Sequence, residues 1–313
     1  MKILIIGSQK TFNAEFFYNK AFNHLGFETD ILNMYENVKH SLFTRIIHTR
    51  TSLFHFLQNS IYVNKDLDQK VREIDPDAII VFKGEFLSAR SLELLSENYN
   101  VYLFYPDMFK FKPILKNRLQ YYKCVFTAAN KTGFYVKMGA KRVVTVPWAC
   151  DPSFHRKIET NKKYDVSFVG TAYRERKRIV GKVGNVTTFG DFWGKTINAH
   201  PGVYGEDYIR VINETRINLN LQAKENTSAD APTMRTFELA GSGGFQISEY
   251  MPSLIQYFPM MVTFRDPNEL KELISYYLEN DIERTEIASR IRDRCYEYFT
   301  YEHAAKSIVN NFI

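Results

Sequence analysis

Short apolar runs alternate with amphipathic stretches along the first half of the chain. The runs are too short for helices and end at glycine, proline or polar residues, as buried strands do. They predict strands at 2–7, 29–32, 77–82, 101–105, 124–128 and 142–147. The stretches between them predict helices at 12–25, 41–74, 88–98, 112–122 and 132–138. Continuous apolar strands joined by helices indicate a parallel sheet that is buried on both faces.

The same rhythm restarts after a polar break at residues 148–163. Strands are predicted at 165–169, 186–189, 217–221, 245–247 and 261–264. Helices are predicted at 177–183, 207–216, 268–278, 282–299 and 301–312, with a short one around Arg235. We therefore predict two Rossmann-like α/β domains, at 1–155 and 156–300, and a closing helix at 301–313 that is a candidate to cross back to the first domain.

Composition agrees with a two-domain globular protein. A chain of 313 residues with 45% hydrophobic and 24% charged residues has the length and balance for two cores. No apolar run approaches the roughly 20 residues of a membrane span. The three cysteines are scattered, which favours a reducing compartment, and we predict a cytoplasmic protein.

The positive charge is concentrated in the first half. Residues 1–155 hold 20 Lys/Arg and 14 Asp/Glu, which accounts for the whole net charge of +6. Residues 39–63 are basic and aromatic, so they suit either a helix lying on an anionic membrane or a core-packed helix with a basic outer face. The second interpretation is favoured. No nucleic-acid-binding module accompanies the charge, and nucleic acid is not predicted as a partner.

The most informative segment runs from Pro232 to Glu249. It predicts a short helix, a glycine-rich break and a buried strand, and it places Arg235 and Glu238 three residues apart on one helix face. A surface ion pair is the ordinary explanation of such a pair. A guanidinium and a carboxylate beside a glycine turn also suit a ligand with a phosphate and a diol, as in a nucleotide sugar.

These residues carry a family resemblance. The phrase Arg235-x-Phe-Glu-x-Ala-Gly before a Gly-Gly-apolar strand, together with segments 165–178, 205–221 and 264–270, resembles the CgeB-like (spore-maturation type) glycosyltransferases over residues 140–313. The resemblance implies a GT-B fold, in which two Rossmann-like domains face each other across a cleft. It also implies transfer of a sugar from a nucleoside-diphosphate sugar to a hydroxyl of a glycan or lipid-linked glycan, with retention of configuration.

The resemblance assigns two acidic residues. Glu238 matches the second glutamate of the Glu-x7-Glu motif of the retaining group, which binds the ribose hydroxyls of the nucleotide. Asp230 stands where the first glutamate would be, so it departs from the motif. Asp230 is a candidate catalytic residue, although a place in a surface loop is favoured for it. The polar stretch 224–231 around it is predicted to be a mobile loop that closes over the donor.

A second phosphate-binding feature is the strand, glycine turn and helix of residues 165–178. Backbone N–H groups at Gly170 and Thr171 would meet an anion at the start of a helix. Of the basic residues that follow, Arg174 and Arg178 lie one turn apart and are predicted to face the diphosphate; a solvent-exposed basic helix is equally compatible. The turn is not G-x-G-x-x-G, so no redox cofactor is predicted.

The phrase around Tyr204 and Gly205 resembles part of the family's nucleotide-base pocket, where an aromatic ring could stack on the base. Packing of a helix start explains Tyr204 and Tyr208 equally well.

Candidates in the first domain lie just beyond strand ends, where open α/β sheets place their sites. Gly7, Ser8 and Lys83 are predicted on the acceptor side, and Glu85 and Asp107 are candidate catalytic carboxylates. Loop capping is favoured for each of them.

No metal is predicted, because the histidines share no ligand spacing and the Asp-x-Asp pairs lie in structural positions. The predicted function is a metal-independent glycosyltransferase, of hexosyltransferase type, in cell-surface polysaccharide synthesis. Two alternatives stay open: a nucleotide-sugar epimerase of similar fold, and a non-catalytic carbohydrate or surface-assembly module.

Overall fold

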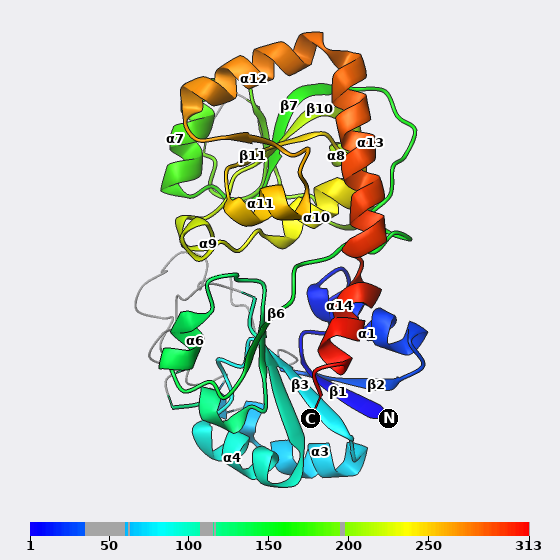
Figure 1. Cartoon of the computed structure of the whole chain (residues 1–313), viewed down its shortest axis with the longest axis vertical. Coiled ribbons are helices and arrows are strands. Elements are labelled where there is room, and N and C mark those ends of the chain that lie inside the picture. Colours follow the sequence, from blue (N-terminus) through cyan, green and yellow to red (C-terminus); the bar gives the residue numbers. More distant parts are fainter. Residues whose placement is uncertain (35–59, 62, 107–114, 116, 195–197, 313) are drawn as a thin grey trace. The chain divides into compact units, whose positions relative to one another are not determined.

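The computed structural model describes residues 1–34, 60–61, 63–106, 115, 117–194 and 198–312. The chain divides into two compact units, one of residues 1–146 with 305–313 and one of residues 147–304. Each unit contains a six-stranded parallel sheet (Figure 1). The prediction of two parallel-sheet α/β domains is therefore confirmed.

The first sheet has the strand order β2-β1-β3-β4-β5-β6. All six predicted strands form, with ends that differ by one or two residues: β1 (Lys2–Gly7), β2 (Glu28–Asn33), β3 (Ala78–Phe82), β4 (Asn100–Phe104), β5 (Val125–Thr127) and β6 (Val143–Thr145). The helices described in this unit are α1 (Ala14–His24), α3 (Leu67–Ile74), α4 (Ala89–Asn98) and α6 (Gly133–Lys137), with a 3₁₀ turn η2 at Leu119–Tyr121.

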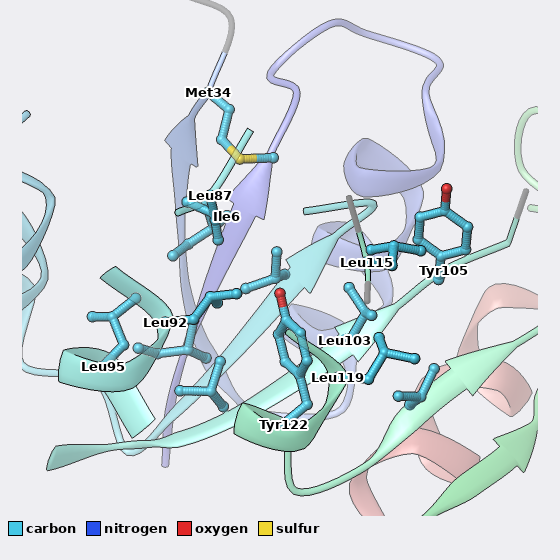
Figure 2. Close-up of a cluster of buried hydrophobic side chains, with 14 of the residues drawn as sticks. Ile6, Met34, Leu87, Leu92, Leu95, Leu103, Tyr105, Leu115, Leu119 and Tyr122 are labelled. Atoms are coloured by element: carbon cyan, nitrogen blue, oxygen red, sulfur yellow. The ribbon is translucent and has the colours of Figure 1, made fainter. Parts of the chain in front are cut away.

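Alternating side chains of these strands form two apolar layers. Ile6 and Leu103 face a core that also contains residues of α3, α4 and η2, among them Leu92, Leu95 and Leu119 (Figure 2). Because successive side chains of a strand point to opposite faces, the residues between them form a second layer. Apolar burial on both faces explains why the strands read as uninterrupted apolar runs.

Aromatic rings dominate the second layer of this sheet. The ring of Tyr18 on α1 lies 5.5 Å from that of Phe82 and 5.1 Å from that of Phe104. Phe312 stacks on Tyr102 of the same sheet, with ring centroids 4.4 Å apart. This contact attaches the end of the chain to the first unit.

The second sheet has the order β12-β11-β10-β7-β8-β9. Its strands are β7 (Tyr164–Val169), β8 (Thr187–Phe189), β9 (Ala199–His200), β10 (Thr215–Asn220), β11 (Gln246–Glu249) and β12 (Val262–Phe264). The sequence pattern misses β9, which is two residues long. The remaining helices are α7 (Arg174–Val183), α8 (Gly205–Glu214), α9 (Lys224–Ala229), α10 (Met234–Gly241), α11 (Pro252–Tyr257), α12 (Pro267–Glu279), α13 (Asp281–Tyr298) and α14 (Tyr301–Val309).

The two faces of the second sheet differ in chemistry. One face is apolar and packs with residues of α7 and α12, including Ile179 and Leu270. Along β10 and β11 the other face carries buried amide and hydroxyl groups, among them Asn218, Asn220 and Gln246. Side chains of α10 bond to this polar face, so it holds a helix by hydrogen bonds where the other relies on apolar contact.

Both sheets contain a point where the strand order reverses. It lies between β1 and β3 in the first sheet and between β7 and β10 in the second. Chains of this architecture bind ligands beyond the carboxyl ends of the strands at such points. Residues that follow β7 and β10 are therefore the first place to look for a site.

No helix among the described residues is both long enough and apolar enough to cross a membrane. Residues 39–63, for which membrane contact was the less favoured of two alternatives, lie outside the described residues except for residues 60, 61 and 63.

Candidate active site

The turn after β7 is held tightly by its neighbours. The N–H of Gly170 donates to the carbonyl of Phe189 at 2.7 Å, and the indole N–H of Trp193 donates to the Gly170 carbonyl at 2.9 Å. Gly170 has φ +150°, and Gly190 packs against its backbone: a Cβ added at Gly190 would lie 2.4 Å from the Gly170 oxygen. The loop after β8 can approach the turn after β7 this closely only because Gly190 lacks a side chain.

Substitution of Gly190 by alanine is expected to destabilise the second unit by at least about 2 kcal/mol, because the added methyl group meets backbone that cannot rotate away. Urea unfolding would measure the loss. Gly181 in α7 is a matched control, since a Cβ there meets nothing within 4 Å. Its replacement by alanine should stabilise by about 0.5–1 kcal/mol; equal effects at the two sites would contradict this account of the turn.

Arg176 connects the two sides of the strand-order reversal in the second sheet. Its guanidinium donates to the carbonyl of Thr171 at 3.0 Å and to that of Leu221 at 2.9 Å, so it binds the chain beyond both β7 and β10. It also lies over the ring of Phe168, 5.1 Å from the centroid. Burial, assisted by the charge of Arg235, lowers the pKa of Arg176 to about 10, so the group stays positively charged at neutral pH.

Arg235 of α10 brings a second guanidinium to the same place. It lies 5.3 Å from the centroid of the Phe168 ring, and a Cβ at Gly170 would be 2.8 Å from its terminal nitrogen. In Arg176 and in Arg235 the Nε atom is buried with no hydrogen-bond partner among the residues that the structure describes. Arg176 is buried and Arg235 is half-buried, and their unused N–H donors provide the chemistry that an anionic ligand with several oxygens requires. We call Arg176 and Arg235 the arginine pair.

The prediction that Arg174 and Arg178 face inward is wrong. Both are exposed, and Arg178 pairs instead with Glu175 on the helix surface. The buried stripe of α7 consists of Arg176, Ile179 and Val180, because the apolar residues at 179 and 180 set which face of the helix meets the sheet.

Glu238 lies one turn after Arg235 on α10 and is 8% exposed. One carboxylate oxygen accepts a hydrogen bond from the hydroxyl of Tyr208 at 3.1 Å, and the other lies 3.9 Å from Nε2 of His155. Burial raises the pKa of Glu238 above its ordinary value of 4.5, while the charge of Arg235 and the Tyr208 hydrogen bond act in the opposite direction. One short helix, α10, thus presents a carboxylate and Arg235, one member of the arginine pair.

Buried polar contacts fix the position of α10 on the sheet. The side-chain amide of Asn220 donates to the hydroxyl of Thr236 at 2.8 Å and to the amide oxygen of Gln246 at 3.1 Å. Gln246 in turn donates to the carbonyl of Thr236 at 3.0 Å. All three residues are fully buried. A satisfied network of this kind specifies one placement of the helix, and with it the placement of Arg235 and Glu238.

Comparison with known proteins now bears on this arrangement. The sequence model of a family described as glycosyl transferase-like matches residues 153–310, just over half of the chain. The chain belongs to this glycosyl transferase-like family. No curated protein matches it in sequence.

Solved glycosyltransferase structures of the GT-B type share the fold of this glycosyl transferase-like protein. Sucrose-phosphate synthase from Thermosynechococcus elongatus superposes with a TM-score of 0.70 at 11% identity, over 99% of this chain and 98% of that one. An E. coli structure described as trehalose-6-phosphate bound with UDP-2-fluoro glucose superposes with a TM-score of 0.65 at 9% sequence identity, over 100% of this chain and 99% of that one. A putative UDP-N-acetylglucosamine 2-epimerase from Listeria monocytogenes superposes with a TM-score of 0.56 at 10% sequence identity, over 98% of this chain and 94% of that one.

Asp230 serves a structural contact in this glycosyl transferase-like chain. Its carboxylate accepts hydrogen bonds from the backbone N–H of Ser253 at 3.1 Å and from the Ser253 hydroxyl at 2.7 Å. Ser253 is the second residue of α11, so Asp230 satisfies a donor at the start of that helix. The segment before it, predicted as a mobile loop, contains α9 (Lys224–Ala229) instead. A catalytic role for Asp230 stays a prediction.

Replacing Asp230 with alanine should separate the two roles. Loss of the cap is expected to lower the free energy of unfolding by about 1–2 kcal/mol, with turnover at saturating donor unchanged. Differential scanning calorimetry and a steady-state transferase assay would measure both quantities. A fall in turnover of 1000-fold or more in a folded variant would instead show that Asp230 takes part in the chemistry.

Tyr204 and Gly205 stand at the start of α8. Tyr204 is 77% exposed, and Gly205 has φ +59° as the first residue of the helix. Their role at the nucleotide base stays a prediction. The residue that contacts Glu238 is Tyr208, one turn further on, for which the sequence left the base pocket and simple packing equally open. The position of Tyr208 one helical turn after Tyr204, with polar residues between the two, was the feature of the sequence that could have indicated its place at the site.

The acceptor-side candidates Gly7 and Ser8 follow β1. The hydroxyl of Ser8 accepts hydrogen bonds from the Lys10 N–H at 3.2 Å and from the Asn13 side chain at 3.1 Å, and its own N–H donates to Glu15 at 3.1 Å. These contacts close the turn onto α1, while the position of Gly7 and Ser8 borders the strand-order reversal of the first sheet.

Lys83 and Glu85 follow β3, on the other side of that reversal. Lys83 has φ +65°, which is uncommon for a residue with a side chain. The next residue, Gly84, has φ +69°. The Glu85 carboxylate accepts a hydrogen bond from the Tyr105 hydroxyl at 3.2 Å. Asp107 lies outside the described residues. The acceptor and catalytic assignments of these residues stay predictions.

Within the described residues, no group of three or more His, Cys, Asp or Glu is placed to hold a metal ion.

Proposed function

We propose that the protein is a glycosyltransferase that moves a hexose from a nucleoside-diphosphate sugar to an acceptor hydroxyl. The observation that carries this proposal is the arginine pair with unused buried N–H donors at the strand-order reversal, of which Arg235 lies one helical turn from the buried carboxylate of Glu238. Membership of the glycosyl transferase-like family supports it. CgeB-like specificity, and a role in cell-surface polysaccharide synthesis, are the finer parts of the proposal.

The second unit would bind the donor. Arg176 and Arg235 would hold the diphosphate and stabilise the charge that develops on it as the bond to the sugar breaks, which is the largest contribution that a site of this type makes. Glu238 would accept hydrogen bonds from the ribose hydroxyls. With the leaving diphosphate stabilised by cationic side chains, the proposed reaction proceeds without a metal ion, and the family resemblance favours retention of configuration.

The first unit would bind the acceptor, a glycan or lipid-linked glycan. Gly7, Ser8 and Lys83 stand beyond the strand ends where an α/β sheet presents its ligand, and Glu85 is the described carboxylate nearest in sequence to that edge. Within this proposal, Glu85 is the candidate to hold or deprotonate the acceptor hydroxyl.

A nucleotide-sugar epimerase is the second candidate, since the Listeria epimerase structure has a related fold. An epimerase converts its substrate without any acceptor, whereas a transferase gives at most slow hydrolysis of the donor. A module without catalytic activity would do neither.

The experiment is a thermal-shift screen against nucleoside diphosphates, followed by incubation of the matching sugar nucleotides with and without glycan acceptors. A ligand that binds only the folded chain raises the melting temperature, by an amount that grows with its concentration relative to Kd. The proposal expects a shift with one or two diphosphates, and acceptor-dependent release of that diphosphate. No shift with any member of the panel would reject the proposal.

A further inference from the structure

The Glu238 carboxylate lies among groups from three separate parts of the second unit. Tyr208 comes from α8, His155 from the segment after β6, and Arg235 from α10 itself. The Tyr208 hydroxyl donates a hydrogen bond to one carboxylate oxygen at 3.1 Å, and Nε2 of His155 lies 3.9 Å from the other, which is beyond hydrogen-bond length. Such convergence from distant positions orients a carboxylate more firmly than a neighbour on the same helix does.

Tyr208 is a fixed hydrogen-bond donor. A phenol has one proton, and the Tyr208 hydroxyl donates it to the Glu238 carboxylate at 3.1 Å. Burial, with the charge of Glu238 adding to it, raises the pKa of Tyr208 well above 10. The hydroxyl therefore keeps its proton over the working pH range and directs it to the carboxylate.

The tautomer of His155 is set by the backbone. The N–H of Asp151 donates to Nδ1 at 2.9 Å, so Nδ1 is an acceptor and the ring proton is on Nε2. Nε2 is the atom that faces Glu238. His155 is 1% exposed, and the same loop is closed by Asp151 accepting from Ser153, which holds the ring in place.

A carboxylate has about four acceptor positions, two on each oxygen. Among the described residues, Tyr208 fills one position on one oxygen, and His155 approaches the other oxygen without a hydrogen bond, so each oxygen keeps at least one position for a ligand. Two acceptors side by side match the two hydroxyls of a vicinal diol. We propose that Tyr208 and His155 are positioning residues that orient Glu238 to accept both ribose hydroxyls of a nucleotide. This inference rests on the proposed function and adds that the site around Glu238 selects nucleotides with ribose over those with deoxyribose.

The test compares binding of UDP with binding of 2′,3′-dideoxy-UDP by calorimetry. The wild-type protein is expected to bind UDP about 30-fold more tightly, as expected for hydrogen bonds to a charged group. Tyr208→Phe, which removes one oxygen atom, should reduce this preference to about threefold. Tyr276→Phe is the matched control, since the hydroxyl of that exposed tyrosine also donates to a glutamate, Glu283, and its loss should leave the preference unchanged.

Two further variants keep the test decisive if Tyr208→Phe folds poorly. His155→Leu should lose most of the preference, and His155→Gln, which can place an N–H donor near the position of Nε2, should recover part of it. Carboxyl NMR of the ligand-free protein adds a readout that needs no nucleotide. The pKa of Glu238 should rise in Tyr208→Phe, because a hydrogen bond to its charged form is lost while Arg235 and His155 stay in place.

The outcomes are distinguishable. A preference that survives in Tyr208→Phe and in His155→Leu overturns the positioning role. Equal binding of both nucleotides by the wild-type protein overturns the diol inference and leaves diphosphate binding by the arginine pair intact. Absence of binding to either nucleotide, and to every other diphosphate of the thermal-shift panel, rejects the proposed function together with the inference.

Discussion

Glu238→Gln is expected to weaken binding of the donor nucleotide about 100-fold without lowering the melting temperature at pH 7. The loss of affinity follows from the loss of charge at the acceptor of the ribose hydroxyls, since hydrogen bonds to a charged group contribute about 1.5–3 kcal/mol each. The retained stability follows from the sign of the pKa shift. Titration calorimetry and scanning calorimetry would measure the two effects on one preparation.

The direction of the Glu238 pKa shift determines how its contribution to stability depends on pH. The pKa of Glu238 is raised in the folded chain, so the folded chain holds this proton more tightly than the unfolded chain does. Stability from the protonated carboxyl is fully present below pH 4.5 and is lost as the pH rises through the raised pKa. At pH 7 the ionised carboxylate therefore destabilises the fold, and a glutamine, which never ionises, avoids this cost.

The matched control is Glu206→Gln, an exposed glutamate in the first turn of α8 that pairs with Arg156. It should change neither the affinity nor the melting temperature by a measurable amount. A Glu238→Gln protein that melts several degrees lower while it binds the donor normally would reverse the assignment and make Glu238 a structural residue.

Arg235→Gln is expected to weaken binding of UDP, and of inorganic pyrophosphate alone, by about 10- to 100-fold. The variant removes a charge and the unused buried N–H from the arginine pair, and each charge-assisted hydrogen bond contributes about 1.5–3 kcal/mol. It also removes a cation that disfavours the charge on Arg176, so the melting temperature of the ligand-free protein should not fall. Competition binding with pyrophosphate isolates the phosphate part of the site.

Arg178→Gln provides the control because Arg178 is exposed and bonded to Glu175. It should leave pyrophosphate binding within about twofold of the wild type. If Arg178→Gln loses the binding and Arg235→Gln retains it, the diphosphate is bound at the outer face of α7, and the burial of the arginine pair has another purpose.

The strands could be predicted because each carries its own signal. Runs such as 2–7 and 78–82 are apolar on both faces and end at glycine or a polar residue, so local sequence is sufficient. The strand β9 (Ala199–His200) could not be predicted, because two residues give no periodicity. The helix α11 was missed for a related reason: it has six residues, and its start is bonded by Asp230, more than twenty positions earlier.

The site was predicted in part. The Arg235–Glu238 helix could be found because its spacing and the glycines after it are local features. The choice among the basic residues of α7 overlooked that Ile179 and Val180 place Arg176 on the buried face of the helix, where its guanidinium donates to the carbonyl of Leu221, 45 residues further along the chain. Spacing within α7 contains no information about that contact. The tautomer of His155 depends likewise on a backbone N–H that no residue pattern reveals.

The buried amides under α10 have a consequence for how this protein could change its substrate. Asn220, Gln246 and Thr236 satisfy one another's hydrogen bonds. Replacing any one of them alone leaves buried polar atoms of the others without a partner. Single substitutions therefore cannot shift α10, and with it Arg235 and Glu238, without breaking this buried network. Under the proposed function, new donor preferences would arise in the surrounding loops, while the residues proposed to bind the diphosphate stay in place.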